Sequence, residues 1–296
     1  MYHSLFEVTT DKEGKQTEHH GTSSWPIACY RGDLNQVKVV WHWHDEWEMI
    51  LACRGALNVG VGPVRDTLAE GEACFIRAGA LHSVWKAETA DSEYHSIVFH
   101  PRLIGSMDSV FWEKYVVPVQ DPAFPEYLRI SDDSAVLAGE LDKAWTAEAE
   151  GKTHHEQEVR NILTRIAAHL SEMSEAKHPF LSEKEKRDME RTKIMLGYIE
   201  KHLSESITIS DIAEAAVISE SECLRCFKRS IGTTPIQYLK ELRIRRAAEM
   251  LSSYNCSVSY AAEHCGFLDM SYFSKSFRCL MGETPKQYRN RVHSPR

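Results

Sequence analysis

The feature of this chain that most constrains its fold is a repeat in its last third. Residues 207–238 and 257–288 carry the same pattern of apolar and small residues, and each copy ends in Gly-x-Thr-Pro. The front parts are offset by 49 residues and the back parts by 50. Each copy predicts a short helix, a tight turn and a second helix, which together form a helix-turn-helix unit. Matching positions are Ile209 and Val258, Ala213 and Ala262, Ile218 and Phe267, Phe227 and Phe277, Gly232 and Gly282, Pro235 and Pro285, and Tyr238 and Tyr288.

Residues that favour helix starts stand at the predicted boundaries. Thr208 with Asp211 forms a capping-box pattern before the first helix, and Ser219 with Glu222 forms another before the second. Gly266 suits a turn with positive φ. The expected N-caps in the second copy are Ser257 and Asp269. The predicted helices are therefore 209–216, 220–230 and 270–280, with one long helix at 235–252 between the copies.

The second helix of each copy presents a face suited to DNA. Phe227 and Phe277 face the core, so the opposite face is free to meet base edges, to which Arg and hydroxyl groups bond readily. The candidates for base contacts are Ser221, Leu224, Arg225, Ser271, Ser274 and Lys275. The candidates for phosphate contacts, one turn later, are Lys228, Arg229 and Arg278. A solvated helix face would explain one copy alone, but two copies at equal spacing favour binding to two successive major grooves, roughly 34 Å apart.

The last hundred residues resemble the DNA-binding domain of the AraC/XylS family of bacterial transcription regulators. The elements that carry the resemblance are Ile212-Ala213, Phe227-Lys228, Gly232-x-x-Pro235, Tyr238-Leu239, Arg243-Ile244, Ala247, Gly266-Phe267, Ser271-Tyr272-Phe273, Phe277 and Gly282-x-Thr284-Pro285. The resemblance implies promoter binding as a homodimer on repeated half-sites, usually as an activator with RNA polymerase as a partner. Two departures are Val217, where Gly or a small polar residue is common, and Cys223, where Leu is common.

Charge is divided unevenly along the chain. The whole sequence has a net charge of −8, but residues 187–296 hold 17 Lys and Arg against 13 Asp and Glu. A basic C-terminal module behind an acidic body fits a DNA reader that is carried by a sensor. No apolar run approaches the ~18 residues of a transmembrane helix, and the first 20 residues lack a secretory pattern. The sequence therefore predicts a cytoplasmic protein with no membrane partner.

The residue pattern changes from strand-like to helical after about residue 100. Short β-rich runs at 37–43, 48–53, 56–61, 73–77 and 94–100 predict a sandwich or small barrel. The segments 134–149 and 156–173 have helical periodicity. Their apolar stripe either packs on the barrel or forms a dimer seam, and it comprises Val159, Ile162, Leu163, Ile166 and Leu170. We predict a ligand-sensing domain at 1–105, a helical dimerisation segment at 106–181 and a DNA-binding domain at 187–296.

A cluster of histidines marks the candidate ligand site. In a strand, His42 and His44 point to the same side. With Glu48 and His82 from neighbouring strands they compose a metal site of the His₃Glu type. The spacings from His42 to Gly55 and from Gly71 to His82 resemble the two cupin motifs, although Arg77 stands where Pro is usual and Lys86 where Asn is common. The predicted fold is α+β and multidomain: an N-terminal cupin jelly-roll barrel, a helical dimerisation segment and a C-terminal all-α tandem helix-turn-helix domain.

Three functions remain open from the residues. The first is a regulator that binds a small-molecule effector, such as a sugar, and controls carbohydrate-utilisation genes. In it the histidines and Glu48 bond the ligand, and Trp47 and Trp85 stack on it. The second is a metal-responsive regulator with a divalent metal cofactor on His42, His44, Glu48 and His82. The third is a metal-dependent cupin enzyme on a DNA anchor. No separate acid–base pair is evident, so a regulator that is not an enzyme is favoured.

Overall fold

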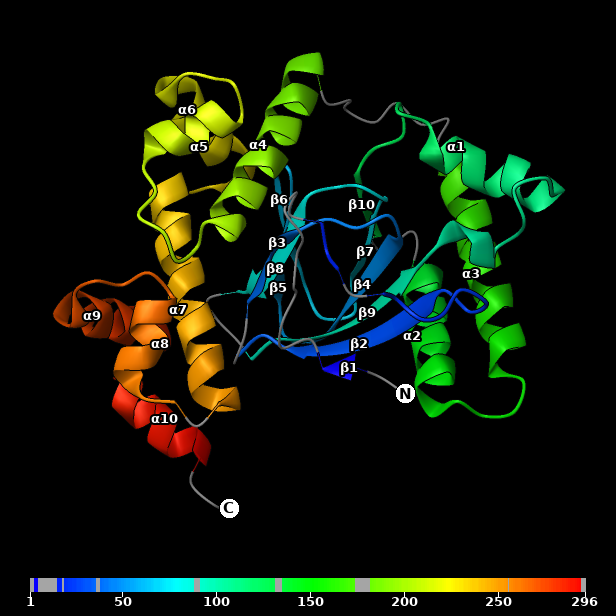
Figure 1. The fold of residues 1–296 in the computed structure, drawn as a ribbon. Coiled ribbons are helices and arrows are strands. Elements are labelled where there is room, and N and C mark those ends of the chain that lie inside the picture. Colours follow the sequence, from blue (N-terminus) through cyan, green and yellow to red (C-terminus); the bar gives the residue numbers. More distant parts are fainter. Residues whose placement is uncertain are drawn as a thin grey trace. The chain divides into compact units, whose positions relative to one another are not determined.

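The computed structural model divides into two compact units, with the boundary between Met189 and Glu190 (Figure 1). The structure describes residues 3–4, 15–17, 19–35, 38–87, 91–130, 135–173, 182–254 and 256–293. The first unit contains the strands and helices α1 to α3, and the second contains α5 to α10. Helix α4 (Glu183–Lys201) spans the boundary. The predicted α+β organisation, with a β domain followed by a helical domain, is confirmed.

The strands of the first unit form two sheets. The larger sheet has the order β1-β2-β9-β4-β7-β10, and the smaller has the order β3-β8-β5-β6. This two-sheet arrangement, in which most neighbouring strands are antiparallel, is the sandwich that the short strands predicted. The strands are β1 (His3–Ser4), β2 (Ile27–Asp33), β3 (Val39–His42), β4 (Trp47–Arg54), β5 (Leu57–Val61), β6 (Val64–Leu68), β7 (Ala73–Ile76), β8 (His82–Lys86), β9 (Glu93–Phe99) and β10 (Tyr127–Ile130). The predicted strand at 37–43 corresponds to β3, and residue 37 lies outside the described residues.

Alternation along β4 shows how the larger sheet is covered on both faces. Ile50 and Ala52 belong to the core between the two sheets. Trp47, Met49 and Leu51 belong to a second core, which they share with the helices of this unit. Successive side chains of a strand point to opposite faces, so one strand serves both cores. The near-continuous apolar sequence of β4 is the consequence.

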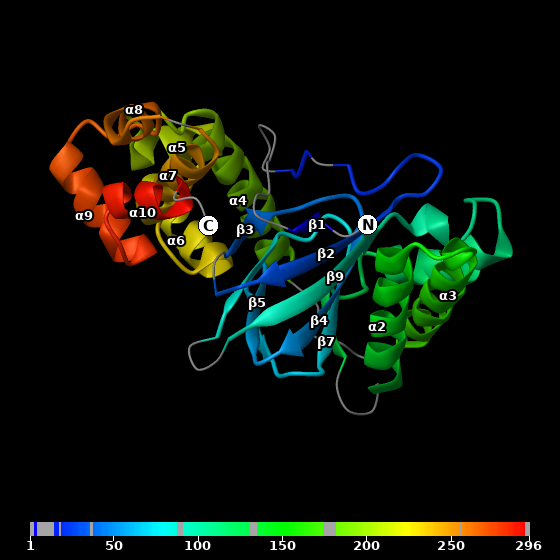
Figure 2. The same ribbon diagram turned by 90° about the horizontal axis from the view of Figure 1, so that it is seen from below.

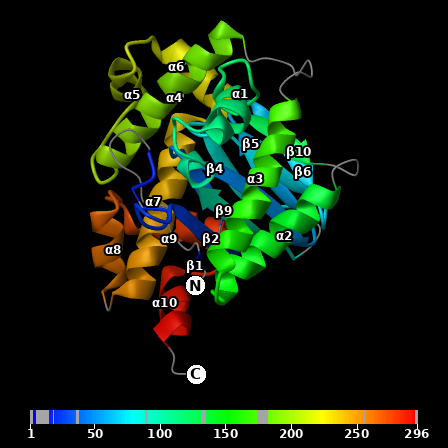
Figure 3. The same ribbon diagram turned by 90° about the vertical axis from the view of Figure 1, so that its right-hand side faces the viewer.

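Helices cover the outer face of the larger sheet. Helices α2 (Ala135–Glu150) and α3 (His155–Met173) lie side by side against it (Figures 2 and 3). The segment before them forms η1 (Pro101–Leu103), η2 (Trp112–Val116) and α1 (Val117–Gln120). The apolar stripe predicted from the sequence is buried in this same core: Val159, Ile162, Leu163, Ile166 and Leu170. The stripe therefore packs on its own domain, so a dimer seam on these helices would have to use other residues.

The second unit is built from two similar halves joined by a long helix. Helix α7 (Pro235–Ser253) contacts both halves and lies between them in Figure 1. The first half contains α5 (Ile209–Ala215) and α6 (Glu220–Ile231), and the second contains α8 (Val258–His264), α9 (Met270–Met281) and α10 (Pro285–His293). The predicted boundaries agree within one or two residues. None of the helices in the described part of the chain has the length and apolar character needed to cross a membrane.

Each of the two halves is stabilised by an aromatic pair at matching positions. The ring of Phe227 lies 5.6 Å from that of Tyr238, and Phe277 lies 5.6 Å from Tyr288. Edge-to-face pairs at this distance add to the stability from apolar burial. The predicted capping box of Thr208 is present in full. Ser219 caps α6 as predicted. The carboxylate of Glu222, which was expected to complete its capping box, pairs instead with Arg191 and Arg225.

Candidate metal centre and DNA-reading helices

The four residues of the predicted His₃Glu set converge in the first unit. His42 ends β3 and lies directly opposite His82, which begins β8. His44 follows β3, and Glu48 points inward from β4. All four are buried, and their ligand atoms lie within 4.8 Å of one another. The antiparallel register of β3 and β8 thus brings together residues that are 40 positions apart.

Backbone carbonyl groups fix the tautomer of each of the three histidines. Every one places its Nδ1 atom against a carbonyl oxygen two residues away, at distances of 2.9 Å from His42 to Val40, 3.2 Å from His44 to Glu46 and 2.8 Å from His82 to Ala80. A carbonyl oxygen only accepts hydrogen bonds, so each Nδ1 carries the hydrogen. The Nε2 atom of each ring is thereby directed into the site, which is the arrangement that orients histidine ligands in metal sites.

The carboxylate of Glu48 faces these Nε2 atoms. Its Oε2 atom lies 2.8 Å from Nε2 of His82 and 3.4 Å from Nε2 of His44. Ser96 donates a hydrogen bond of 2.5 Å to the other oxygen and so orients the group. Burial raises the pKa of Glu48, but its contacts with His44 and His82 outweigh burial and hold the pKa well below the usual range. An ionised carboxylate and nitrogen lone pairs at this distance repel each other unless a proton or a metal ion lies between them.

The electrostatics of His42 also fit a metal ligand. Burial, together with the nearby His82 and His44, holds the pKa of His42 well below its ordinary value, so its ring is neutral. Metal ions bind neutral imidazole, and they bind carboxylates in the ionised form. Ligands of one transition-metal ion at about 2.0–2.2 Å lie roughly 3 Å apart when adjacent. The spacing of the four side chains, with the neutral ring of His42 and the ionised Glu48, therefore fits a divalent metal ion.

The cavity at this cluster is small. Its volume is about 10 Å³, and it is lined by Gln16, His20, Tyr30, Val39, His42, His44, Glu48, His82, Val84, Tyr94 and Val98. A cavity of this size has room for about one water-sized group. Pockets for drug-sized organic ligands usually measure roughly 300–1,000 Å³. The cavity accommodates an ion or a water-sized ligand, and a sugar ring does not fit.

The structure corrects the prediction that Trp47 and Trp85 line the ligand site. Trp47 precedes the inward-facing Glu48, so it points to the outer face of β4. There its ring lies 5.4 Å from that of Phe75 in the core beneath the helices. Trp85 follows Val84, which lines the cavity, so it also points away. Its ring instead meets the ammonium group of Lys38 at 5.4 Å.

The residues in the cavity that the sequence analysis missed include His20 and Tyr94. His20 and Tyr94 line it together with the four predicted ligands. The hydroxyl of Tyr30 lies 2.7 Å from Nδ1 of His20. Burial, with a smaller effect of His44, lowers the pKa of His20 to about 3, so this ring is neutral too. Neither residue belongs to a motif, and only the folded strands bring them to the site.

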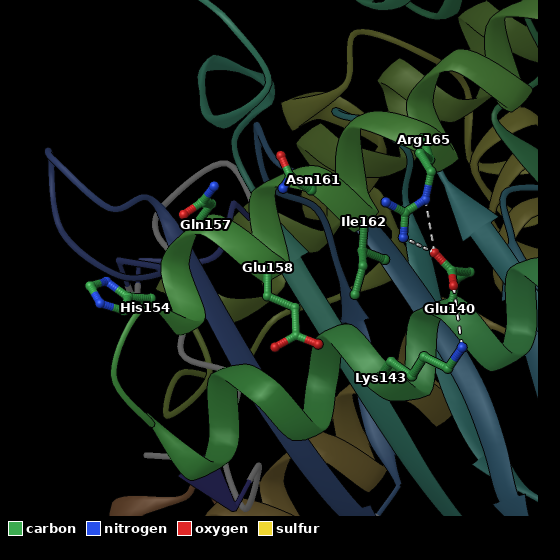
Figure 4. A pocket seen from close by; sticks show the side chains of 8 residues that line it. All are labelled: Glu140, Lys143, His154, Gln157, Glu158, Asn161, Ile162 and Arg165. Atoms are coloured by element: carbon green, nitrogen blue, oxygen red, sulfur yellow. Dashed lines mark hydrogen bonds and ion pairs between the residues drawn. The ribbon is translucent and has the colours of Figure 1, made fainter.

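A larger, polar groove lies elsewhere in the first unit, on the outer face of α2 and α3 (Figure 4). Its volume is about 460 Å³, and it is lined by Glu140, Lys143, His154, Gln157, Glu158, Asn161, Ile162 and Arg165. Arg165 and Lys143 both pair with Glu140, and Figure 4 shows these contacts. The groove is an open, charged surface between two helices.

The residues predicted to meet DNA lie on the outward faces of α6 and α9. Those that are exposed are Ser221, Arg225, Lys228, Arg229, Ser271, Lys275 and Arg278, and those that are partly exposed are Leu224 and Ser274. The opposite faces are buried through Phe227 and Phe277. The guanidinium of Arg225 is paired with Glu222. Both helices therefore present polar and basic side chains to solvent, as binding in a major groove requires.

Exposed apolar residues beside α9 were not predicted. Leu268, in the turn before this helix, is 95% exposed, and Tyr272 in its first turn is 53% exposed. Single exposed apolar residues are common on protein surfaces, but these two lie at the start of a helix predicted to read DNA. In a major groove, an apolar side chain contacts the methyl group of thymine. Both residues are therefore further candidates for base contacts.

Comparisons with known proteins cover both domains of the chain. The family model for an AraC-like ligand-binding domain matches residues 24–184, and that for a helix-turn-helix domain matches residues 212–291. The HTH-type transcriptional regulator YdeC of Bacillus subtilis is 29% identical over 288 residues, which cover 94% of this chain and 97% of YdeC. The HTH-type transcriptional activator RhaS of Pectobacterium atrosepticum is 24% identical over 86% of this chain and 88% of RhaS.

Among solved structures, that of ToxT from Vibrio cholerae O395 covers 93% of this chain and 100% of ToxT, at 12% identity and a TM-score of 0.45. The ligand-binding model alone spans more than half of the 296 residues. The relatives are transcription regulators, so the enzyme alternative is set aside. The chain belongs to the AraC family of ligand-responsive, DNA-binding transcription regulators.

Proposed function

We propose that this regulator takes a divalent transition-metal ion as its effector, bound by His42, His44, Glu48 and His82, and that it activates transcription. The observation that carries the proposal is the convergence of three histidine side chains and one carboxylate in a buried site, with their ligand atoms within 4.8 Å of one another. Imidazole and carboxylate ligands together suit first-row ions such as Mn²⁺, Fe²⁺, Co²⁺, Ni²⁺ and Zn²⁺. The metal ion would supply positive charge between the carboxylate and the ring nitrogens that face it.

The size of the cavity favours a metal ion over an organic effector. With about 10 Å³ available, the site is smaller than usual organic-ligand pockets by more than a factor of ten. The alternative of a sugar effector and carbohydrate-utilisation genes draws no support from this cavity. It remains the competing outcome in the first experiment below.

Ion binding would connect three strands of the sensor domain. The ligands come from β3 and the second residue after it, from β4 and from β8, and these strands belong to both sheets. An ion that binds one arrangement of these strands more tightly than another shifts the protein toward it, by as much as the difference in affinity. This difference is the means by which the metal would alter DNA binding.

The relatives support the proposed activator role, and the reading helices support DNA binding. Full-length relatives are named transcriptional activators, and α6 and α9 present the polar faces described above. We propose a homodimer on repeated promoter half-sites, with RNA polymerase as its partner.

For the dimer contact we propose the outward groove of α2 and α3 (Figure 4), because the apolar stripe of α3 is buried within the chain. Reversing the charge of the exposed Glu158 with Glu158→Lys should convert dimer to monomer in sedimentation velocity.

The first experiment tests metal binding by the full-length protein. Protein stripped with a chelator is given each of the five ions, and thermal unfolding and bound metal are measured. An ion at 100 times its dissociation constant should stabilise the fold by about 2.7 kcal/mol. His44→Ala should abolish this effect, and His19→Ala, an exposed neighbour of the site, should retain it. Stabilisation by a sugar in chelated protein, with none by any ion, would replace the metal with an organic effector.

The second experiment asks whether the metal is an effector. DNA duplexes selected from a random pool by the metal-loaded protein are footprinted and used to measure affinity with and without metal. We expect protection of two major grooves about one helical turn apart, and tighter binding with metal. In His44→Ala this dependence should disappear. Equal DNA affinity with and without a tightly bound ion would make the metal purely structural and contradict its role as effector.

A further inference from the structure

Besides Nε2 of His82, which faces Glu48, two buried polar atoms of the sensor cavity stand out in the described part of the chain. The Nε2 atom of His20 and the hydroxyl of Tyr94 have no hydrogen-bond partner. Both residues line the cavity of the His₃Glu cluster, and they are only 5% and 1% exposed. Buried polar groups without partners are uncommon in folded proteins and indicate a bound group, such as a water molecule or ion.

The surrounding structure fixes both groups. Nδ1 of His20 contacts the hydroxyl of Tyr30 at 2.7 Å, which leaves Nε2 free on the other side of the ring. Tyr94 on β9 lies opposite Gly32 on β2. A Cβ atom at Gly32 would lie 2.0 Å from Cε1 and 2.7 Å from the hydroxyl of Tyr94. The glycine thus makes room for this ring, and any other residue would displace it.

His20 is placed too far out to be a ligand of the same ion. The set of atoms within 4.8 Å of one another consists of His42, His44, Glu48 and His82, and His20 groups instead with His44 and Glu46. Two ligands at about 2.1 Å from one ion lie at most roughly 4.2 Å apart. His20 is therefore suited to contact a group carried by the ion.

We infer that His20 and Tyr94 bind a water-sized ligand of the metal ion, either water or a monatomic anion; this inference rests on the proposed function. Four protein ligands leave coordination positions open on a six-coordinate ion. Tyr94 donates through its hydroxyl. His20 donates through Nε2 when Tyr30 donates to Nδ1. With the ion held between the four protein ligands, the cavity of about 10 Å³ has room for one water-sized ligand and excludes larger ones.

The test uses full-length protein loaded with Co²⁺, whose visible absorption bands report coordination, and fluoride as a water-sized anion that accepts hydrogen bonds. In the unaltered protein, fluoride should change these bands and thiocyanate, which is longer, should not. His20→Ala and Tyr94→Phe should each raise the dissociation constant of fluoride about tenfold, as expected for one hydrogen bond to an ion. The dissociation constant of Co²⁺ should change by no more than about twofold in either variant, well below the change expected for fluoride.

Two further variants sharpen the result. His19→Ala alters the exposed neighbour and should leave fluoride binding unchanged. His20→Gln keeps an N–H donor and should restore part of the affinity that His20→Ala loses. Circular dichroism verifies that each variant is folded.

Several outcomes would overturn the inference, and they differ from failure of the proposed function. If Co²⁺ binds but fluoride affinity is the same in both variants, His20 and Tyr94 do not hold the ligand. If His20→Ala loses Co²⁺ itself, His20 is a direct metal ligand and the inference is wrong. If the unaltered protein binds no Co²⁺, the proposed function fails, and the inference fails with it.

Discussion

The two helix-turn-helix units close their turns with the same hydrogen bonds but with different residues at the centre. Val217 has φ +55° in the first turn, and Gly266 has φ +76° in the second. In the first turn the backbone N–H groups of Val217 and Ile218 donate to the carbonyls of Glu214 and Ala213, at 2.9 and 3.0 Å. In the second turn those of Gly266 and Phe267 donate to the carbonyls of Glu263 and Ala262, both at 3.0 Å. A β-branched residue is strained in this region, whereas glycine is not. The two turns thus follow the same backbone path, although valine is less suited to positive φ than glycine.

The surroundings of the turns explain the difference. Val217 is 89% exposed, so its side chain meets solvent and displaces nothing. At Gly266, an added Cβ would lie 2.9 Å from the guanidinium of Arg243. That guanidinium donates to the carbonyls of Leu203 and Glu205 and so secures the loop before α5. The second turn requires glycine for space as well as for φ, and the first turn tolerates strain because it has open space.

The largest effect is expected from placing valine in the second turn. Gly266→Val should destabilise the protein by about 3 kcal/mol, since left-handed backbone costs about 1–2 kcal/mol and the displaced Arg243 loses two hydrogen bonds. Urea unfolding measures the loss. Gly282→Val is the matched control, because Gly282 has φ +78° with nothing within 4 Å of an added Cβ. Equal losses in the two variants would show that Arg243 plays no part.

The reading helices should differ in their contribution to DNA binding. Arg225 and Lys275 occupy equivalent positions, but Arg225 is paired with Glu222, where the second copy has Tyr272. We expect Lys275→Ala to weaken binding to selected DNA by about 1–3 kcal/mol. Arg225→Ala should cost less, because binding through Arg225 first requires its ion pair to break. Fluorescence anisotropy measures both, and an equal loss would remove this distinction between the units.

Relief of strain in the first turn should be a smaller effect of opposite sign. Val217→Gly is expected to stabilise the protein by about 0.5–1 kcal/mol, because the strain relieved exceeds the extra backbone entropy of glycine. The midpoint of urea unfolding should rise. An unchanged or lower midpoint would mean that the exposed valine side chain stabilises the turn by more than its backbone strain.

The smallest effect concerns the acid on the first reading helix. Removing the charge with Glu222→Gln should tighten DNA binding about twofold at low salt, and the gain should vanish at high salt because of screening. Glu214→Gln, an exposed acid on α5, serves as the control. If the gain persists at high salt, the effect on binding is not electrostatic.

The repeat made the second unit predictable from sequence. Capping residues, glycine stops and buried Phe227 and Phe277 are local signals, and each corresponds to the observed element. The strain at Val217 was also foreseeable, because the second copy has Gly at the same place. The role of Arg243 was not, because it depends on a contact that the repeat does not share.

The sensor site was predictable only in part. The alternation of strand residues and the cupin spacing brought out His42, His44, Glu48 and His82. The same alternation excludes Trp47, which is adjacent to Glu48 and so faces the opposite side of β4. His20 and Tyr94 carry no spacing signal, since His20 lies before β2 and Tyr94 reaches the cavity through the space left by Gly32.

Because α7 is continuous, the number of its residues sets the spacing of the two reading helices. This helix has 19 residues, which corresponds to a length of about 28 Å at 1.5 Å per residue. One inserted or deleted residue would turn everything beyond it by about 100° and shift it by 1.5 Å. The two halves would then no longer face the same side of a DNA duplex. A substitution on the surface of α7 would therefore preserve this spacing, whereas a change in its length would not.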